Sequence, residues 1–176
     1  MRIVGGIYKG RVLCPFEKIG VRPTSDMTRE SLFNILQNVI PGARVLDLFA
    51  GTGAIGIEAL SRGAGEVVIN DASRDAIALI KKNLEKLKIE NGVSITNYDA
   101  LTLISKGQKT FDVVYIDPPY QSEIYDKVLG EIYKILSEDG IVVVESEKPI
   151  ENDYQGLIKY DNRKYGRAYL TFYRKD

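Results

Sequence analysis

The feature that most constrains the fold of this 176-residue chain is a regular alternation that begins at residue 43. Short runs rich in β-branched residues alternate with amphipathic segments of helix length, which is typical of a parallel sheet covered by helices on both faces. The runs predict five parallel strands, at 44–49, 66–71, 93–99, 111–117 and 140–147. The intervening segments predict helices, at 54–62, 73–88 and 122–137. We therefore expect an α/β fold in which the apolar stripe of each helix packs into the core.

The two ends of the chain do not follow this alternation. Residues 2–13 read as a β-hairpin with two glycines, Gly5 and Gly6, between short β-like runs. A helix then begins after Thr24 or Ser25, either of which is a suitable N-cap. Near the other end, the segment GLIKYDNRKYGRAYLTFYR predicts a final hairpin with a positively charged turn.

The length of the chain leaves room for one core of ordinary size. We expect a single domain over residues 1–176, with an N-terminal hairpin extension at 1–24 and the main α/β core at 25–176.

Composition excludes several classes of protein. The sequence has no histidine and one cysteine, Cys14, so it lacks the commonest metal ligand and general base and can form no internal disulfide. Serine–histidine hydrolases and histidine-ligated zinc enzymes are excluded, and we expect no metal.

No apolar run is long enough to cross a bilayer, and the opening MRIVGGIYKGR lacks a signal-peptide pattern. We accordingly expect a cytoplasmic protein without a membrane partner.

The net charge of zero conceals an uneven distribution of charge. Residues 1–29 and 159–176 each hold six basic and two acidic residues, so each segment carries +4. The stretch 30–158 holds 12 basic and 20 acidic residues and carries −8. If the two ends meet in space they could form a phosphate-facing patch, whereas the alternative is an ordinary solvated surface.

A glycine motif follows the first predicted parallel strand. Gly51, Gly53 and Gly56 satisfy G-x-G-x-x-G between a strand and a helix, where backbone amides at a helix start can approach a ligand. Asp71 lies 20 residues past Gly51 at the end of the next strand, where a carboxylate can accept both hydroxyls of a ribose. This pattern suits a nicotinamide dinucleotide or S-adenosylmethionine, and it also occurs in turns that bind nothing.

Asp47 distinguishes the two ligands. It lies four residues before the first glycine, where a carboxylate would repel a pyrophosphate but would hold the cationic amino-acid end of S-adenosylmethionine, directly or through water. Asp99, at the end of the third strand, could accept the adenine amino group, with Ala100 or Leu101 against the ring. Asp99 could equally cap the helix that follows it, and the two roles are compatible.

The sequence DPPY ends the fourth parallel strand, at the edge where open α/β sheets bind their ligands. Two prolines remove two N–H donors and leave carbonyl groups as acceptors, which suits an amino group as the ligand. Asp117 and the Pro118 carbonyl could accept both hydrogens of a nucleobase amine and direct its lone pair at a methyl donor, while Tyr120 stacks on the base. In isolation, such a tetrapeptide is more often a rigid turn.

Taken together, these motifs resemble the 16S ribosomal RNA guanine-N2 methyltransferase family. The resemblance covers nearly the whole chain and rests on R-I-V-G-G-x-Y-K-G-R at 2–11, R-P-T-S-D-x-x-R-E-S-L-F-N at 22–34, VLDLFAGTGAIGIEALSRGA, VYIDPPY and VESE. It implies a Rossmann-like, S-adenosylmethionine-dependent methyltransferase with a seven-stranded, mostly parallel sheet. Asn70 and Asp71 depart mildly from similar sequences, which often have an apolar residue and glutamate there.

The resemblance and the motifs give three sets of expected site residues. The catalytic set is Asp117, Pro118 and Tyr120. The cofactor-binding set is Asp47, Phe49, Ala50, Gly51, Thr52, Gly53, Asp71, Ala72, Asp99, Ala100 and Asp117. The RNA-binding set is Arg2, Lys9, Arg11, Arg22, Thr24 and Arg29.

The expected substrate is a guanine of 16S rRNA that is unpaired or splayed out of its helix, within a 30S subunit or an assembly intermediate. We expect the enzyme to act as a monomer. One alternative is a DNA adenine or cytosine amino-methyltransferase, although no target-recognition domain is inserted. Others are a protein-glutamine methylase, which would favour asparagine at position 117, and a non-catalytic rRNA-binding assembly module.

Overall fold

The computed structural model describes residues 1–15, 25–107, 109–119 and 122–176, which form one seven-stranded sheet with helices on both faces. The strands are β1 (Arg44–Asp47), β2 (Glu66–Asn70), β3 (Val93–Thr96), β4 (Phe111–Ile116), β5 (Leu136–Ser146), β6 (Leu157–Tyr165) and β7 (Ala168–Lys175). The helices are α1 (Asp26–Ile35), α2 (Ala54–Ser61), α3 (Arg74–Leu87), α4 (Ala100–Lys106) and α5 (Ser122–Leu129), with a 3-10 turn η1 (Ile132–Ile135).

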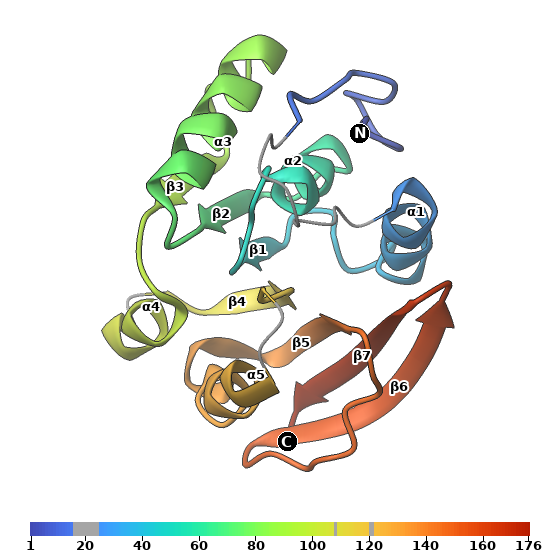
Figure 1. Cartoon of the computed structure of the whole chain (residues 1–176), viewed down its shortest axis with the longest axis vertical. Coiled ribbons are helices and arrows are strands. Elements are labelled where there is room, and N and C mark those ends of the chain that lie inside the picture. Colours follow the sequence, from blue (N-terminus) through green and yellow to red (C-terminus); the bar gives the residue numbers. More distant parts are fainter. Residues whose placement is uncertain (16–24, 108, 120–121) are drawn as a thin grey trace.

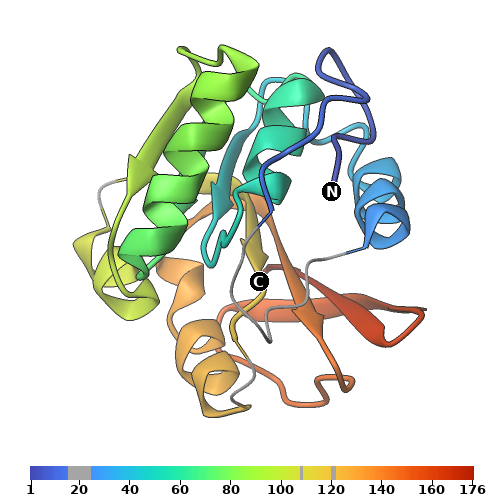
Figure 2. The same ribbon diagram turned by 45° about the horizontal axis from the view of Figure 1, so that its top comes forward.

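The sheet has the strand order β3-β2-β1-β4-β5-β7-β6. Strands β1 to β5 are parallel, and β7 is antiparallel to both β5 and β6. The predicted α/β class, the five parallel strands and the C-terminal hairpin are therefore confirmed. Figure 1 shows α1, α2 and α3 on one side of the central strands and α4 and α5 on the other, and Figure 2 shows the same layers from above.

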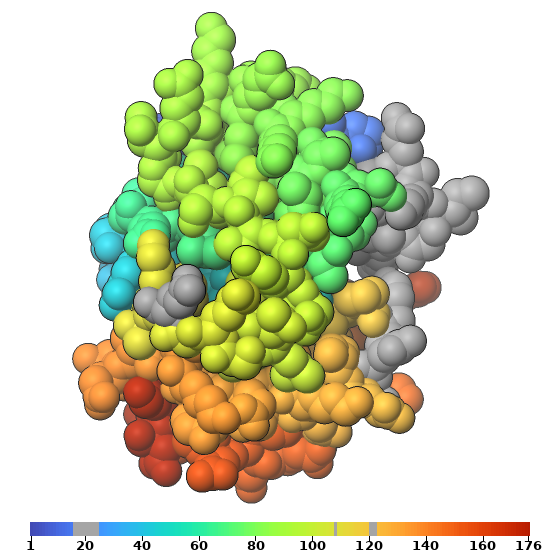
Figure 3. Space-filling view, turned by 90° about the vertical axis from the view of Figure 1, so that its left-hand side faces the viewer, coloured from blue at the N-terminus to red at the C-terminus, as the bar shows by residue number. Residues whose placement is uncertain are grey.

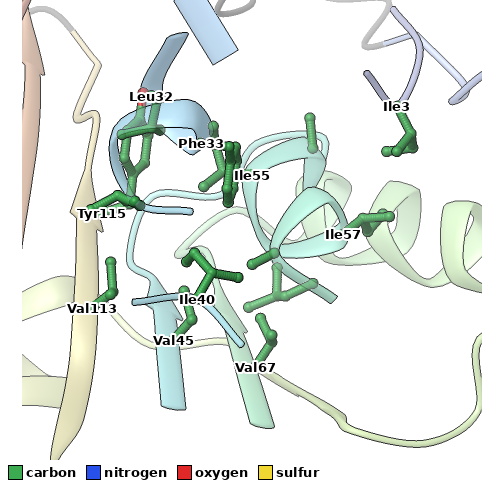
Figure 4. Close-up of a cluster of buried hydrophobic side chains, with 14 of the residues drawn as sticks. Ile3, Leu32, Phe33, Ile40, Val45, Ile55, Ile57, Val67, Val113 and Tyr115 are labelled. Atoms are coloured by element: carbon green, nitrogen blue, oxygen red, sulfur yellow. The ribbon is translucent and has the colours of Figure 1, made fainter. Parts of the chain in front are cut away.

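Alternation along each central strand divides the core into two layers. Val45 and Val113 pack beneath α1, α2 and α3, whereas Leu46 and Val114 pack beneath α4 and α5. Burial on both faces explains why these strands are continuous apolar runs. Figure 4 shows the first layer, where Tyr115 of β4 lies close to Leu32 and Phe33 of α1. In the space-filling view of Figure 3, α3 and α4 cover the upper and middle parts of one side of the molecule.

The helix predicted over 122–137 is shorter than the pattern suggested. It ends at Leu129, and Leu136 instead pairs with Phe111 at the start of β5. The apolar periodicity continued because η1 also buries Ile132 and Ile135 against the same core layer. The periodic pattern of buried residues therefore continues past the last residue of the helix, so the pattern does not reveal where the helix ends. Within the described part of the chain, no helix is long and apolar enough to span a bilayer.

The predicted N-terminal hairpin is reduced to a single antiparallel bridge between Arg2 and Val12. Gly5 and Gly6 are not the central residues of its turn, because the chain turns at residues 7–10. The two glycines lie against α2, where a Cβ on Gly6 would come within 1.8 Å of the Ser61 carbonyl oxygen. The Ile7 amide donates to that same carbonyl at 2.8 Å. The two glycines therefore permit close contact with a helix and do not reverse the chain. The proposed boundary at residue 24 borders the segment 16–24, which lies outside the described residues.

A buried glutamate attaches this extension to the core. Glu58 of α2 has no exposed surface, and its carboxylate accepts the amides of Val4 at 2.8 Å and Gly5 at 2.7 Å. Arg62 donates to it at 2.8 Å, and the fully buried Arg29 lies 3.7 Å away. A buried charge needs several such partners to offset its lost hydration. The first residues of the chain therefore form part of the domain core.

We predict that Glu58→Ala lowers the free energy of unfolding by about 3–5 kcal/mol, because it removes the buried carboxylate that faces the Arg29 guanidinium and leaves the Val4 and Gly5 amides without their acceptor. Urea denaturation would measure the loss. Glu85→Ala, which removes an exposed glutamate from α3, is the matched control and should change stability by no more than about 0.5 kcal/mol. Equal stabilities for the two variants would contradict the role of Glu58.

Candidate active site

The candidate site lies where the direction of strand order reverses, between β1 and β4. The chain after β1 leads into α2 on one face, and the chain after β4 leads into α5 on the other. Open α/β sheets bind ligands at the carboxyl ends of the strands, at the point where two such connections leave toward opposite faces. Asp47 ends β1 and pairs in register with Tyr115 of β4, so Asp117 follows at the same edge.

Asp47 is buried, with 1% of its surface exposed. Its Oδ2 accepts the Gly56 amide in the first turn of α2 at 2.9 Å. Burial raises the pKa of Asp47 from its ordinary value to about 7, the Gly56 hydrogen bond lowers it, and the nearby carboxylate of Asp71 raises it. Among the described residues no arginine or lysine pairs with Asp47. Such a carboxylate is stabilised by a proton or by a cationic ligand.

The glycine turn has the form that the motif predicts. Gly51 and Gly53 have positive φ values of 54° and 77°, which side-chain-bearing residues rarely adopt. A Cβ on Gly51 would meet nothing within 4 Å, so this part of the backbone faces open space that a ligand can approach. A Cβ on Gly56 would lie 2.7 Å from Ile69, so the third glycine permits close packing of α2 on β2.

Asp71 lies directly after β2 and contacts the glycine turn. Its carboxylate accepts the amides of Gly51 and Ser73, both at 2.8 Å. The backbone carbonyls of Asp71 and Ala72 both accept the Asn97 amide group, at 2.8 and 3.0 Å. The predicted cofactor residues at the ends of β1 and β2 therefore lie together, as the spacing of 20 residues indicated.

Two buried asparagines support this turn, and the sequence alone indicates a role for neither of them. Asn70 donates to the carbonyls of Leu48 and Tyr98, both at 3.0 Å, and so connects the loops after β1 and β3. Asn83 of α3 donates to the Thr52 carbonyl at 3.0 Å and accepts the Cys14 amide at 2.7 Å. A polar residue at the end of an apolar strand or on the apolar stripe of a helix is the only sequence signal for such roles.

Asp99 is the N-cap of α4. Its carboxylate accepts the amide of Thr102 at 2.9 Å and also the hydroxyl of that residue. The side-chain and backbone hydrogen bonds from Thr102 hold the pKa of Asp99 below its ordinary value, so it remains ionised. Ala100 is buried next to it, and Leu101 is half-buried. The capping role is therefore confirmed, whereas adenine binding remains a prediction.

Asp117 is the first residue after β4, beside the chain exit from β1. Burial raises the pKa of its carboxyl well above the ordinary value, and the neighbouring acids Glu145 and Asp47 raise it further. Pro118 is buried beside it. The third predicted catalytic residue, Tyr120, lies outside the described residues. The site thus brings several carboxylates to one edge of the sheet, an arrangement that attracts cations and N–H donors.

The predicted RNA-binding residues have different environments. Arg2, Lys9 and Arg11 are exposed on the N-terminal extension. The prediction for Arg29 is wrong, because its side chain has no exposed surface and donates inward to Asp26 at 2.8 Å and to the Arg2 carbonyl. Sequence alone could not separate a buried structural arginine from an exposed one. Arg22 and Thr24 lie outside the described residues.

The fold and this edge of acids and glycines define an α/β methyltransferase. Over residues 1–174 the chain matches the model of a family described as Conserved hypothetical protein 95. It is 36% identical to the ribosomal RNA small subunit methyltransferase D of Escherichia coli (strain K12), over 86% of this chain and 76% of that one. It is 35% identical to YlbH of Bacillus subtilis (strain 168), provisionally named an rRNA methyltransferase, over 99% of both chains. The chain belongs to this family.

A solved structure supports the same assignment. The Escherichia coli protein yhhF, provisionally named a methyltransferase, superposes with a TM-score of 0.87 over 100% of this chain and 98% of its own, at 28% sequence identity. The predicted Rossmann-like methyltransferase fold with a seven-stranded sheet is therefore confirmed. Enzymes of this class take their methyl group from S-adenosylmethionine. Its sulfonium and ammonium charges fit an edge that presents the buried Asp47, which has no basic partner among the described residues, beside an open glycine turn.

We predict that Asp47 makes folding stability depend on pH. Its pKa is near 3.8 when unfolded and about 7 when folded, so the folded protein binds the proton more tightly and this contribution to stability falls as pH rises from 4 to 7. Asp47→Asn should remove that slope, and its stability relative to wild type should improve across this range by up to about 4 kcal/mol. Urea denaturation at several pH values measures the difference, with the exposed Asp139→Asn as control. A constant offset between Asp47→Asn and wild type would refute the assignment.

Proposed function

We propose that this protein transfers a methyl group from S-adenosyl-L-methionine to the N2 amino group of a guanine in 16S rRNA. The observation that carries the proposal is the position of Asp117 and Pro118, at the exit of β4 beside the glycine turn and one strand from Asp47. This arrangement puts an amine acceptor next to a site for a cationic donor. Family membership and the name of the Escherichia coli relative support small-subunit rRNA as the substrate.

The donor supplies an electrophilic methyl group on a sulfonium centre. Within the chain, Asp47 provides a negative charge for the cationic end of this ligand, and Asp71 provides acceptors for ribose hydroxyls. The open backbone at Gly51 permits close approach of the ligand. Asp99 and Ala100 at the start of α4 line the side assigned to adenine, with Phe49, Ala50, Thr52, Gly53 and Ala72 along the turn.

On the base side, the amino group needs activation because its lone pair is delocalised into the ring. Asp117 and the Pro118 carbonyl accept its two hydrogens and so direct the lone pair toward the methyl group. Burial and adjacent acids destabilise the ionised Asp117, and the same conditions increase what it gains from an N–H donor. No histidine is required for this chemistry, in agreement with the sequence. Tyr120 retains its proposed role of stacking on the base.

The proposed RNA surface combines both basic ends of the chain. Arg2, Lys9 and Arg11 are exposed on the extension, which α2 and α3 hold in place. Arg167 lies in the turn between β6 and β7, and Arg163 and Lys164 lie near the end of β6. This turn is at the active-site edge, because Tyr169 pairs with Ser146, the last residue of β5. We propose that the enzyme acts in the cytoplasm as a monomer on an assembling small subunit.

The direct test of function is transfer of tritium-labelled methyl groups. Undermethylated 30S subunits, naked 16S rRNA and DNA would each be incubated with the enzyme and labelled donor. We expect label in the ribosomal substrate, recovered as N2-methylguanosine at one position when the RNA is digested and analysed by mass spectrometry. Label found only in DNA would overturn the proposal, and label in 30S subunits but not in naked RNA would identify the particle as the substrate.

We predict that Asp71→Ala weakens donor binding by about 1–3 kcal/mol, because buried ribose hydroxyls would lose their acceptors. Isothermal titration calorimetry with the donor gives the affinity directly. The control is Asp139→Ala, an exposed change in β5. Unchanged affinity in Asp71→Ala would show that the ribose lies elsewhere.

For Asp117→Ala we predict a separation of binding from catalysis. Methylation should fall by about 10²-fold or more, because the amino group loses a positioned acceptor, while donor affinity should change little. Single-turnover rates and calorimetry on the same preparation measure both quantities. Loss of donor binding instead would show that Asp117 serves the cofactor-binding role that the sequence also predicts for it, and not the role at the base.

A further inference from the structure

A second carboxylate, Glu145, lies beside Asp117 at the mouth of the sheet. Val144 of β5 pairs in parallel register with Ile116, the last residue of β4, so Glu145 on β5 and Asp117 directly after β4 are the next residues along the two chains, and the charge of Glu145 acts on Asp117. Neighbouring strands lie about 4.8 Å apart, and lateral neighbours in a sheet project from the same face. The two carboxylates therefore start from adjacent points on one face, the face that also carries Asp47 and Tyr115.

Contacts from both layers of the fold fix the position of Glu145. The hydroxyl of Tyr115, a side chain that is only 3% exposed, donates to its Oε2. From the opposite layer, the hydroxyl of Tyr125 in α5 donates to its backbone carbonyl at 3.1 Å. Glu145 itself is half-buried. Its carboxylate is thus held at the rim of the site, with the buried phenol behind it.

The charges at this edge favour a ligand rich in hydrogen-bond donors. The acids Glu145 and Asp47 both act on Asp117, and in the described part of the chain no basic side chain pairs with Asp47 or Asp117. Asp117 and the Pro118 carbonyl suffice to accept the two hydrogens of one amino group. Glu145 adds a carboxylate beside them, and because a carboxylate offers about four acceptor positions, it can accept a further N–H in addition to the partners that it already has, such as Tyr115.

We propose that Glu145 accepts the N1–H of the target guanine and thereby determines which base the enzyme selects. The inference rests on the proposed function and extends it to the base itself. Guanine presents N1–H and the N2 amino group as adjacent donors on its pairing edge. Adenine and cytosine present an amino group next to a ring nitrogen that has a lone pair, which the Glu145 carboxylate would repel. Glu145 is thus a specificity-determining residue, distinct from the amine acceptor Asp117.

The test changes the pairing edge of the base and one acceptor on the protein. 2-Aminopurine keeps the N2 amino group but lacks both the N1–H and the O6 of guanine, so the change in base ratio between wild type and Glu145→Gln, and not the wild-type preference alone, reports on the N1 contact. Small subunits would be reconstituted with 16S rRNA carrying guanine or 2-aminopurine at the mapped position. We expect the wild-type enzyme to prefer guanine by about ten- to a hundred-fold in kcat/KM. Glu145→Gln, whose amide can donate to N1, should lose most of its activity on guanine and shift the guanine to 2-aminopurine ratio at least tenfold toward 2-aminopurine.

The matched control is Glu147→Gln, the same change at an exposed residue two positions further along. It should leave the base ratio unchanged. Fluorescence of the 2-aminopurine base reports its entry into the site separately from methyl transfer, and it should show tighter binding to Glu145→Gln than to wild type. Donor affinity, measured by calorimetry, should remain the same in all three proteins.

Two outcomes would overturn the inference. If Glu145→Gln slows both bases equally, Glu145 only supports its neighbours. If the wild-type enzyme methylates 2-aminopurine as efficiently as guanine, N1 is not read, and this result needs no variant. Failure of the wild-type enzyme to methylate guanine in rRNA at all would instead refute the proposed function, so the two failures are distinguishable.

Discussion

The hydrogen bond between the buried Asp47 carboxylate and the Gly56 amide is the interaction on which the site depends most. It connects the end of β1 to the first turn of α2 and so fixes the loop between them. The start of a helix stabilises a carboxylate through its free amides and its dipole, which offsets part of the lost hydration. The remainder is uncompensated, as the raised pKa of Asp47 shows. The fold therefore holds Asp47 at a position where its negative charge is neutralised only when a proton or a cation binds.

Much of the architecture could be predicted because its determinants are local in sequence. Apolar runs bounded by glycine and helix caps gave the parallel strands, and G-x-G-x-x-G with Asp71 gave one side of the site. The structure adds that Gly51 and Gly56 serve different purposes, since one faces open space and the other contacts Ile69. A sequence motif records both glycines without distinguishing these roles.

The features that could not be predicted from the sequence depend on contacts between residues that are far apart in the chain. Arg29 resembles any basic residue at a helix start until Glu58 is placed against it, and Gly5–Gly6 resembles a hairpin turn until α2 is placed beneath it. Glu145 had no recognisable role because its partner Tyr115 is 30 residues away. Pairings of this kind are set by strand order and register, which the residues themselves do not encode locally.

The placement of charge follows from the same topology. The parallel strands bring Asp47, Asp117 and Glu145 to one edge, whereas the antiparallel β7 returns the basic β6–β7 turn to that edge from the C-terminal end. Arg163 and Tyr165, near this turn, line a hollow together with α1, so the N-terminal and C-terminal regions of the chain meet. An RNA carries negative phosphates outside and N–H donors on its bases. An acidic centre with basic residues at its margin therefore favours an RNA whose extruded base lies in the centre and whose phosphate backbone lies at the margin. A uniformly basic surface would bind phosphates everywhere and would not favour this orientation.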